Sequence, residues 1–106
     1  MAWAILVLAG ALEVVWAYYM KLSDGFTKPL PSAITLVAMI ASFALLSYSM
    51  KVLPLGTAYT IWTGIGAVGA FLVGVIVLGE PANAPRMVAA VLIVSGLIMM
   101  KVATPT

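Results

Sequence analysis

The sequence contains no cysteine and no histidine. Without cysteine the chain can form neither a disulfide bond nor a thiolate metal site. Without histidine it lacks the most common metal ligand and the usual general base at neutral pH. Charge is also scarce, with five Lys or Arg and three Asp or Glu among 106 residues, and no basic cluster indicates nucleic-acid binding. We therefore expect no metal, no cofactor, no nucleic-acid partner and no enzymatic activity.

Apolar residues are what the sequence has in abundance. They make up 65% of the chain, and only 8% of its residues are charged. In a soluble domain about 25% of the residues are charged. A helix of about 20 residues is ~30 Å long, which matches the hydrocarbon core of a bilayer. The sequence predicts an all-α membrane protein, a single domain over 1–106, with four spans at about 2–20, 32–50, 57–78 and 86–102.

Short connections separate the four runs. Ser23-Asp24-Gly25 has the composition of a turn. Pro31 and Pro85 are suited to the first turn of a helix, because the missing N–H needs no partner there. The connection from Lys51 to Pro54 is so short that the helices on either side must be antiparallel neighbours. The first and third loops then lie on one side of the membrane and the termini on the other.

Glu13 is the only charge in the apolar run from Met1 to Met20 and would lie in the middle third of the membrane. A charged side chain at the bilayer centre costs about 2.5–3.5 kcal/mol on insertion scales. It could be a structural hydrogen-bonding group, but intramembrane carboxylates more often mark ion pathways or proton relays. Gly10 and Trp16 lie three residues away and share its helix face. We interpret Glu13 as the functional centre.

The third span places Tyr59, Trp62 and Gly66 on one helical face. Tyr59 and Trp62 can supply hydrogen bonds and flat rings to a planar cation, or they can belong to an interfacial aromatic belt. Gly64 and Gly66 could form a hinge in mid-membrane. A stripe of Gly66, Ala70 and Gly74 could equally serve close helix packing.

In the second span, Ser42 is a lone hydroxyl deep in an apolar run. Met39 lies one turn before it and Phe43 is adjacent. These two side chains could simply fill space or face lipid. If the site opens sideways, they could form a flexible apolar wall at the opening.

The basic residues of the loops are divided almost evenly between the two sides. Lys51 and Lys101 lie on the side of the termini, and Lys21, Lys28 and Arg86 lie on the other. This difference is too small to fix orientation by the positive-inside rule. We expect both orientations and an antiparallel homodimer, with a single orientation set by other signals as the alternative.

Taken together, these residues resemble the small multidrug resistance family over the whole chain. Two motifs are similar to its guanidinium-exporter subtype: Glu13-Val-Val-Trp16 and Gly56-Thr-Ala-Tyr-Thr-Ile-Trp-Thr-Gly-Ile-Gly66. The resemblance implies an antiparallel homodimer that exchanges protons for guanidinium. Carried over by position, Glu13 binds protons and substrate in turn, and the site is lined by Gly10, Trp16, Ser42, Tyr59 and Trp62. Met39 and Phe43 would flank a lateral opening, and Gly64 and Gly66 match the flexible point of the third helix. Tyr18-Tyr19 departs from the pattern, which has smaller or aliphatic residues there, and the two hydroxyls could alter access to the site on one side.

The expected function is therefore export of guanidinium and small substituted guanidiniums from a prokaryotic cell. The protein would be multi-pass in the cell inner or plasma membrane, with lipid, protons and a second copy of itself as partners. One alternative is a broad-range exporter of quaternary or aromatic drug cations. A less favoured one is a non-transporting membrane subunit, which would not explain a mid-membrane carboxylate beside polar aromatic residues.

Overall fold

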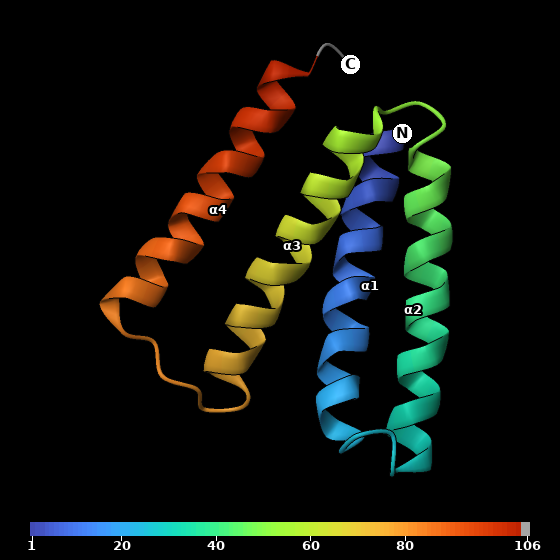
Figure 1. Ribbon diagram of the computed structural model, residues 1–106, viewed down its shortest axis with the longest axis vertical. Coiled ribbons are helices and arrows are strands. Elements are labelled where there is room, and N and C mark those ends of the chain that lie inside the picture. Colours follow the sequence, from blue (N-terminus) through green and yellow to red (C-terminus); the bar gives the residue numbers. More distant parts are fainter. Residues whose placement is uncertain (105–106) are drawn as a thin grey trace.

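The structure is a computed structural model that describes residues 1–104. It contains four long helices: α1 (Ala2–Leu22), α2 (Pro29–Ser49), α3 (Leu55–Ile76) and α4 (Ala84–Ala103) (Figure 1). Each is long and apolar enough to cross a membrane. The prediction of four helical spans in an all-α chain is confirmed. Pro105 and Thr106, the last residues of the predicted domain, lie outside the described residues.

The helix ends differ from the expected ones by up to three residues, for reasons visible in the capping. α2 begins at Pro29 and not near Pro31, because Lys28 before it is extended and Pro29 itself fits the first helical position. α4 begins at Ala84, because the Asn83 side chain accepts a hydrogen bond from the Arg86 backbone N–H at 3.1 Å.

The first loop is organised by Ser23, which is fully buried. Its hydroxyl donates to the Met20 carbonyl at 2.7 Å and accepts from the Phe26 backbone N–H at 3.1 Å. Asp24, Gly25 and Phe26 all have positive φ, which reverses the chain within a few residues. The predicted turn is present, and the serine holds it together.

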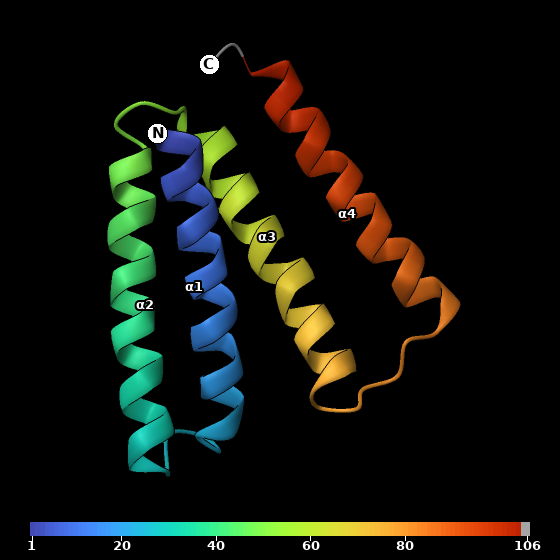
Figure 2. The same ribbon diagram turned by 180° about the vertical axis from the view of Figure 1, so that it is seen from behind.

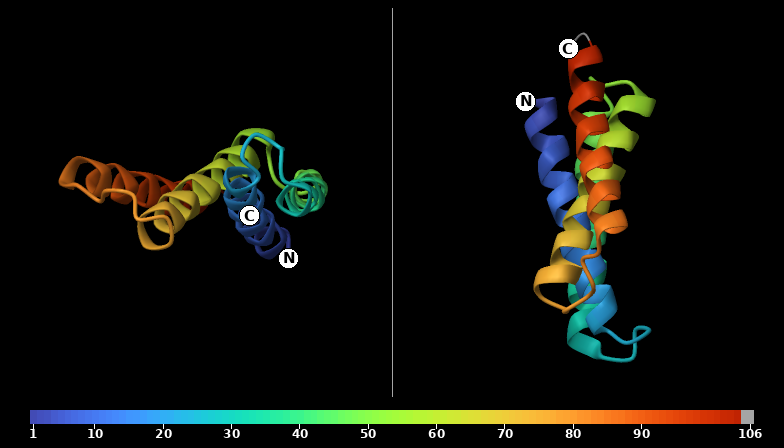
Figure 3. Two further views of the ribbon diagram at one scale, coloured as in Figure 1. Left: turned by 90° about the horizontal axis from the view of Figure 1, so that it is seen from below. Right: turned by 90° about the vertical axis from the view of Figure 1, so that its left-hand side faces the viewer.

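The molecule is flat, with extents of 43 × 35 × 17 Å. α1 packs between α2 and α3, whereas α4 packs on α3 alone (Figures 1 and 2). No residue of α4 is buried. The view from below shows α2 and α4 at opposite ends of the molecule, with α1 and α3 between them (Figure 3). One copy of the chain therefore does not close a bundle around a site.

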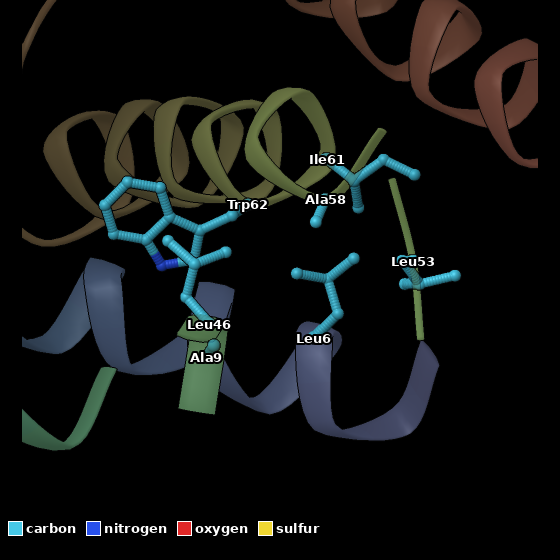
Figure 4. Close-up of a cluster of buried hydrophobic side chains, with 7 residues drawn as sticks. All are labelled: Leu6, Ala9, Leu46, Leu53, Ala58, Ile61 and Trp62. Atoms are coloured by element: carbon cyan, nitrogen blue, oxygen red, sulfur yellow. The ribbon is translucent and has the colours of Figure 1, made fainter. Parts of the chain in front are cut away.

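The core lies where α1, α2 and α3 meet, near the end of the molecule at which α1 begins. Figure 4 shows its seven side chains: Leu6, Ala9, Leu46, Leu53, Ala58, Ile61 and Trp62. Small residues at Ala9 and Ala58 allow the helix backbones to approach each other. This cluster fixes the part of α3 that carries Trp62.

Glycines of α3 provide close contacts on two different sides. A Cβ added at Gly66 would collide with the Glu13 carboxyl of α1, whereas one added at Gly64 would collide with Leu97 of α4. On α1, a Cβ at Gly10 would lie 2.7 Å from Ile65 Cγ2. Helix packing thus accounts for both Gly64 and Gly66. α3 is one continuous helix in this structure. A hinge at Gly64 and Gly66 stays a prediction, which concerns a change of conformation.

Candidate functional site

Glu13 lies midway along α1 and faces α3. It is partly buried, and its carboxyl group rests on Gly66, where any side chain would collide with it. Glu13 Oε1 is a buried atom that has no hydrogen-bond partner within residues 1–104. The same is true of Trp16 Nε1, one helical turn further along α1. A buried polar atom in this situation is costly unless a ligand or a proton satisfies it.

A chain of hydrogen bonds joins α1, α2 and α3 beside Glu13. The buried Ser42 hydroxyl of α2 donates to the Ala9 carbonyl of α1 at 2.7 Å. Trp62 Nε1 of α3 donates to Ser42 Oγ at 3.0 Å. Trp62 is only 6% exposed, so the N–H has little access to other partners. Ser42 therefore orients the Trp62 ring and fixes its distance from α1.

Four aromatic rings form a continuous row across the same three helices. Phe43 packs edge-on against Trp16 at 6.3 Å and against Trp62 at 5.6 Å between ring centroids. Tyr59 packs against Trp62 at 5.6 Å, with the planes tilted by 58°. Such pairs are favourable by about 0.5–1.5 kcal/mol beyond the area that they bury. The row presents aromatic faces and edges next to the carboxylate.

The structure brings most of the predicted site residues together. Glu13, Gly66 and Trp16 gather at the α1–α3 contact, and Ser42, Trp62 and Tyr59 form the adjoining network. Tyr59 is half exposed at the edge of this network, and among residues 1–104 no hydrogen bond joins its hydroxyl to Glu13. Gly10 packs on Ile65, and Gly64 faces α4.

The sequence predicted Phe43 only as part of the wall of a lateral opening, together with Met39. Phe43 is 47% exposed and also joins the rings of Trp16 and Trp62. Met39 is partly buried one turn before it on α2. The spacing of Trp16 and Trp62 in the sequence gave no sign that a third ring connects them, because that contact depends on how α2 is rotated.

We expect Ser42→Ala to destabilise the protein by about 1–3 kcal/mol, because Trp62 Nε1 would be left buried without an acceptor. Ser47→Ala on the same helix is the matched control, since Ser47 is exposed. Thermal unfolding in detergent, followed by Trp fluorescence, measures the difference. Equal midpoints for the two variants would show that the Trp62–Ser42 hydrogen bond does not stabilise the fold.

Comparisons with known proteins show the family of this chain. A family model described as "Small Multidrug Resistance protein" matches residues 1–93. The chain is 56% identical over 104 residues to a protein of Escherichia coli K12 named "Guanidinium exporter", covering 98% of this chain and 99% of that protein. Proteins of the same name from Citrobacter freundii and Salmonella typhimurium are each 53% identical over the same shares.

The match extends through α1, α2 and α3, which carry the carboxylate, the serine and the row of rings. The alignments with these relatives cover nearly the whole of both chains. The chain belongs to the small multidrug resistance family, and it is a transporter rather than an enzyme.

Proposed function

We propose that this chain exports guanidinium and small substituted guanidiniums in exchange for protons, with Glu13 as the shared binding group. The observation that carries the proposal is the Glu13 carboxyl, which lies within a membrane span with a buried oxygen that lacks a hydrogen-bond partner within residues 1–104. Relatives at 53–56% identity carry the name of a guanidinium exporter. The chain itself is a multi-pass inner-membrane protein.

The chemistry of the site suits a guanidinium ion. Guanidinium is planar and cationic and carries only hydrogen-bond donors. Its partners must be acceptors and π faces, and these are what Glu13 and the aromatic row offer, with Ser42 holding Trp62 in that row. A guanidinium beside Glu13 would supply a donor to Oε1. The Trp16 N–H has no partner within residues 1–104 and, as a donor, can serve an acceptor such as the carboxylate but not the cation.

Exchange follows from competition for one group. A proton and a guanidinium both neutralise Glu13, so that binding of one favours release of the other. If the site is exposed to each side of the membrane in turn, this competition is sufficient for antiport. In a dimer, the two Glu13 side chains would titrate as a coupled pair, and the apparent pKa values would belong to the pair.

We propose that the working unit is an antiparallel homodimer. The molecule is flat, and in one copy the Glu13 side chain is only partly buried. α4 is apolar and has no buried residue, and Gly96 on it has open space around it, so a second copy can pack there. Within this dimer, Met39 and Phe43 would flank a lateral opening to lipid. Gly64 and Gly66 would allow α3 to bend as access changes sides.

Orientation is tested by single cysteines, for which the cysteine-free chain is a ready background. A cysteine near Thr104 should be labelled from both sides of the cell membrane, because the basic residues are too evenly divided to fix one orientation. Added Lys or Arg on one side should bias the labelling and lower transport. A co-expressed copy biased the other way should restore it. Labelling from one side alone, with full transport, would contradict the antiparallel dimer.

Selectivity separates guanidinium export from broad-range drug export. We expect guanidinium and singly substituted guanidiniums to be carried, and bulky quaternary ammonium ions to be carried at least about tenfold less well. The reason is that a quaternary cation has no N–H to donate to the acceptors of the site, and each hydrogen bond to a charged group is worth about 1.5–3 kcal/mol. Proton flux in liposomes driven by each cation measures this. Equal rates would favour the drug-exporter alternative.

A further inference from the structure

Arg86 is the only arginine of the sequence, so its guanidinium group is the only one that the chain carries. It lies where the third loop meets α4 and has three different partners. Nη2 is 3.7 Å from Glu80 Oε1, Nη1 donates to the Pro81 carbonyl at 2.6 Å, and Cζ lies 5.1 Å from the centre of the Phe71 ring. A carboxylate, a carbonyl oxygen and an aromatic face are the three kinds of group that recognise a guanidinium ion.

Backbone contacts and helix α3 hold Glu80 and Phe71 in place. The Glu80 N–H donates to the Gly74 carbonyl at 2.9 Å, and Gly79 before it has positive φ, which brings the loop back over the end of α3. The Glu80 carboxyl then rests on Gly74, where an added Cβ would collide with it. Phe71 is part of α3, less than one turn before Gly74. Glu80, the Pro81 carbonyl and Phe71 thus form a preformed pocket, which we call the outer cradle.

The outer cradle and Glu13 lie at the two ends of one stripe on α3. Gly66 packs against the Glu13 carboxyl and Gly74 packs against the Glu80 carboxyl, with Ala70 between them. Eight residues of helix separate the two glycines by ~12 Å. A pocket of about 340 Å³ between α1 and α3 is lined on α3 from Ala67 to Gly74 and ends beside Gly66 and Glu13, which do not line it. Its lining includes Val14 and Ala17 at the inner end and Glu80 and Arg86 at the outer end.

We propose that the outer cradle is a second guanidinium-binding site, at the mouth of the α1–α3 pocket, and that the Arg86 side chain occupies it as an internal mimic of the substrate. A guanidinium arriving from the third-loop side displaces Arg86 from Glu80 and is thereby concentrated next to the route toward Glu13. This deepens the proposed function and rests on it for the identity of the substrate.

The ion pair between Arg86 and Glu80 is weak enough for a guanidinium ion to displace the Arg86 side chain. The ion pair with Glu80 has a single long contact, and the two side chains are 37% and 41% exposed. Exposed pairs of this kind contribute little to stability, and their Coulomb attraction is screened by salt. Lys21 also lines the pocket and repels cations. The arriving guanidinium ion, however, takes the place of the guanidinium group of Arg86, which moves out into water. The positive charge beside Lys21 is therefore unchanged.

Because Arg86 is the only arginine, the Nε–Hε resonance of the ¹⁵N-labelled full-length protein reports on this site alone. Guanidinium chloride should shift this signal in a saturable way toward the position that it has in Glu80→Gln. Half-saturation is expected at millimolar to tens of millimolar guanidinium, because a tethered side chain competes at an effective concentration on the order of millimolar. Tetramethylammonium chloride at equal ionic strength, a cation without N–H donors, should leave the signal in place.

Equal shifts with both salts would mean that salt only screens the ion pair, and would overturn the proposal. The proposal would also be overturned if the Arg86 signal did not move below about 100 mM guanidinium, or if guanidinium moved it as far in Glu80→Gln as in the wild type. The same titration in Glu13→Gln should be unchanged, so that a failure of Glu13 as the transport site and a failure of the outer cradle give different results. In transport assays Glu80→Gln should raise the KM for guanidinium roughly twofold to fivefold, with a smaller effect on kcat.

Discussion

Glu13→Gln is expected to abolish proton-coupled guanidinium transport while the protein still inserts and assembles. Glutamine keeps the size and hydrogen-bonding capacity of the side chain but carries no charge and does not titrate. Removing one partner of a buried, hydrogen-bonded charge pair costs about 2–5 kcal/mol. Binding of guanidinium should therefore be weakened roughly thirty-fold to several-thousand-fold. Guanidinium-driven proton flux and direct binding, both on the purified protein, measure the two effects.

Asp24→Asn is the matched control for the loss of one negative charge. Asp24 lies in the first loop with a φ of 50°, a conformation that asparagine adopts readily, so the fold should be kept. Its transport should equal that of the wild type. Transport by Glu13→Gln at the wild-type rate, or a comparable loss in Asp24→Asn, would remove Glu13 from the centre of the mechanism.

Gly66→Ala should reduce transport by about a hundredfold without unfolding the protein. The new Cβ would collide with the Glu13 carboxyl, which is the far end of a flexible side chain and can move aside. Stability is then nearly unchanged, because alanine favours a helix over glycine by about 0.5–1 kcal/mol. The carboxylate, however, is displaced by about an ångström, and misplacement of that size can cost on the order of a hundredfold in rate.

Gly56→Ala is the control, since it makes the same substitution in the same helix. A Cβ at Gly56 would meet nothing within 4 Å. This variant should transport normally and unfold at the same or a slightly higher temperature. If Gly66→Ala transports as well as Gly56→Ala, the contact between Gly66 and Glu13 does not position the carboxylate.

Most of the fold could be predicted because the membrane constrains it strongly. Uncharged runs of suitable length define the four helices. The short connection at Lys51–Pro54 predicted α2 and α3 as close neighbours, but they touch only slightly, because α1 packs between them. The helix starts were less predictable, since they depend on local capping. Asn83 was not recognised as the N-cap of α4, although an asparagine before Ala-Pro is a typical start signal.

The candidate site was predictable only in part. Glu13 can be recognised from the free-energy cost of a charge within a membrane span. This signal is visible in the sequence without knowledge of the neighbouring helices. The contacts around it depend on how the helices are rotated. The sequence placed Gly66 on the face of Tyr59 and Trp62, but it did not indicate that Gly66 lies against Glu13 or that Gly64 lies against Leu97. The three-sided setting of Arg86 could not be foreseen, because it depends on the path of the third loop over Gly74.

The pH dependence of binding follows from the same competition. Guanidinium binding to the wild type should weaken as the pH falls, because protons favour the neutral form of Glu13, which attracts a cation poorly. Binding to Glu13→Gln should be weak at every pH and nearly independent of it. The wild type and this variant therefore differ in the slope of affinity against pH as well as in affinity itself.

The central claim, that protons and guanidinium share Glu13, is tested most directly by counting protons released when guanidinium binds. The purified protein is held in weak buffer at a pH where guanidinium affinity still varies with pH, and guanidinium is added at constant ionic strength. We predict proton release from the wild type and none from Glu13→Gln. Release from Glu13→Gln equal to that of the wild type would contradict the account, because Asp24 and Glu80 are the only other acidic side chains of the sequence.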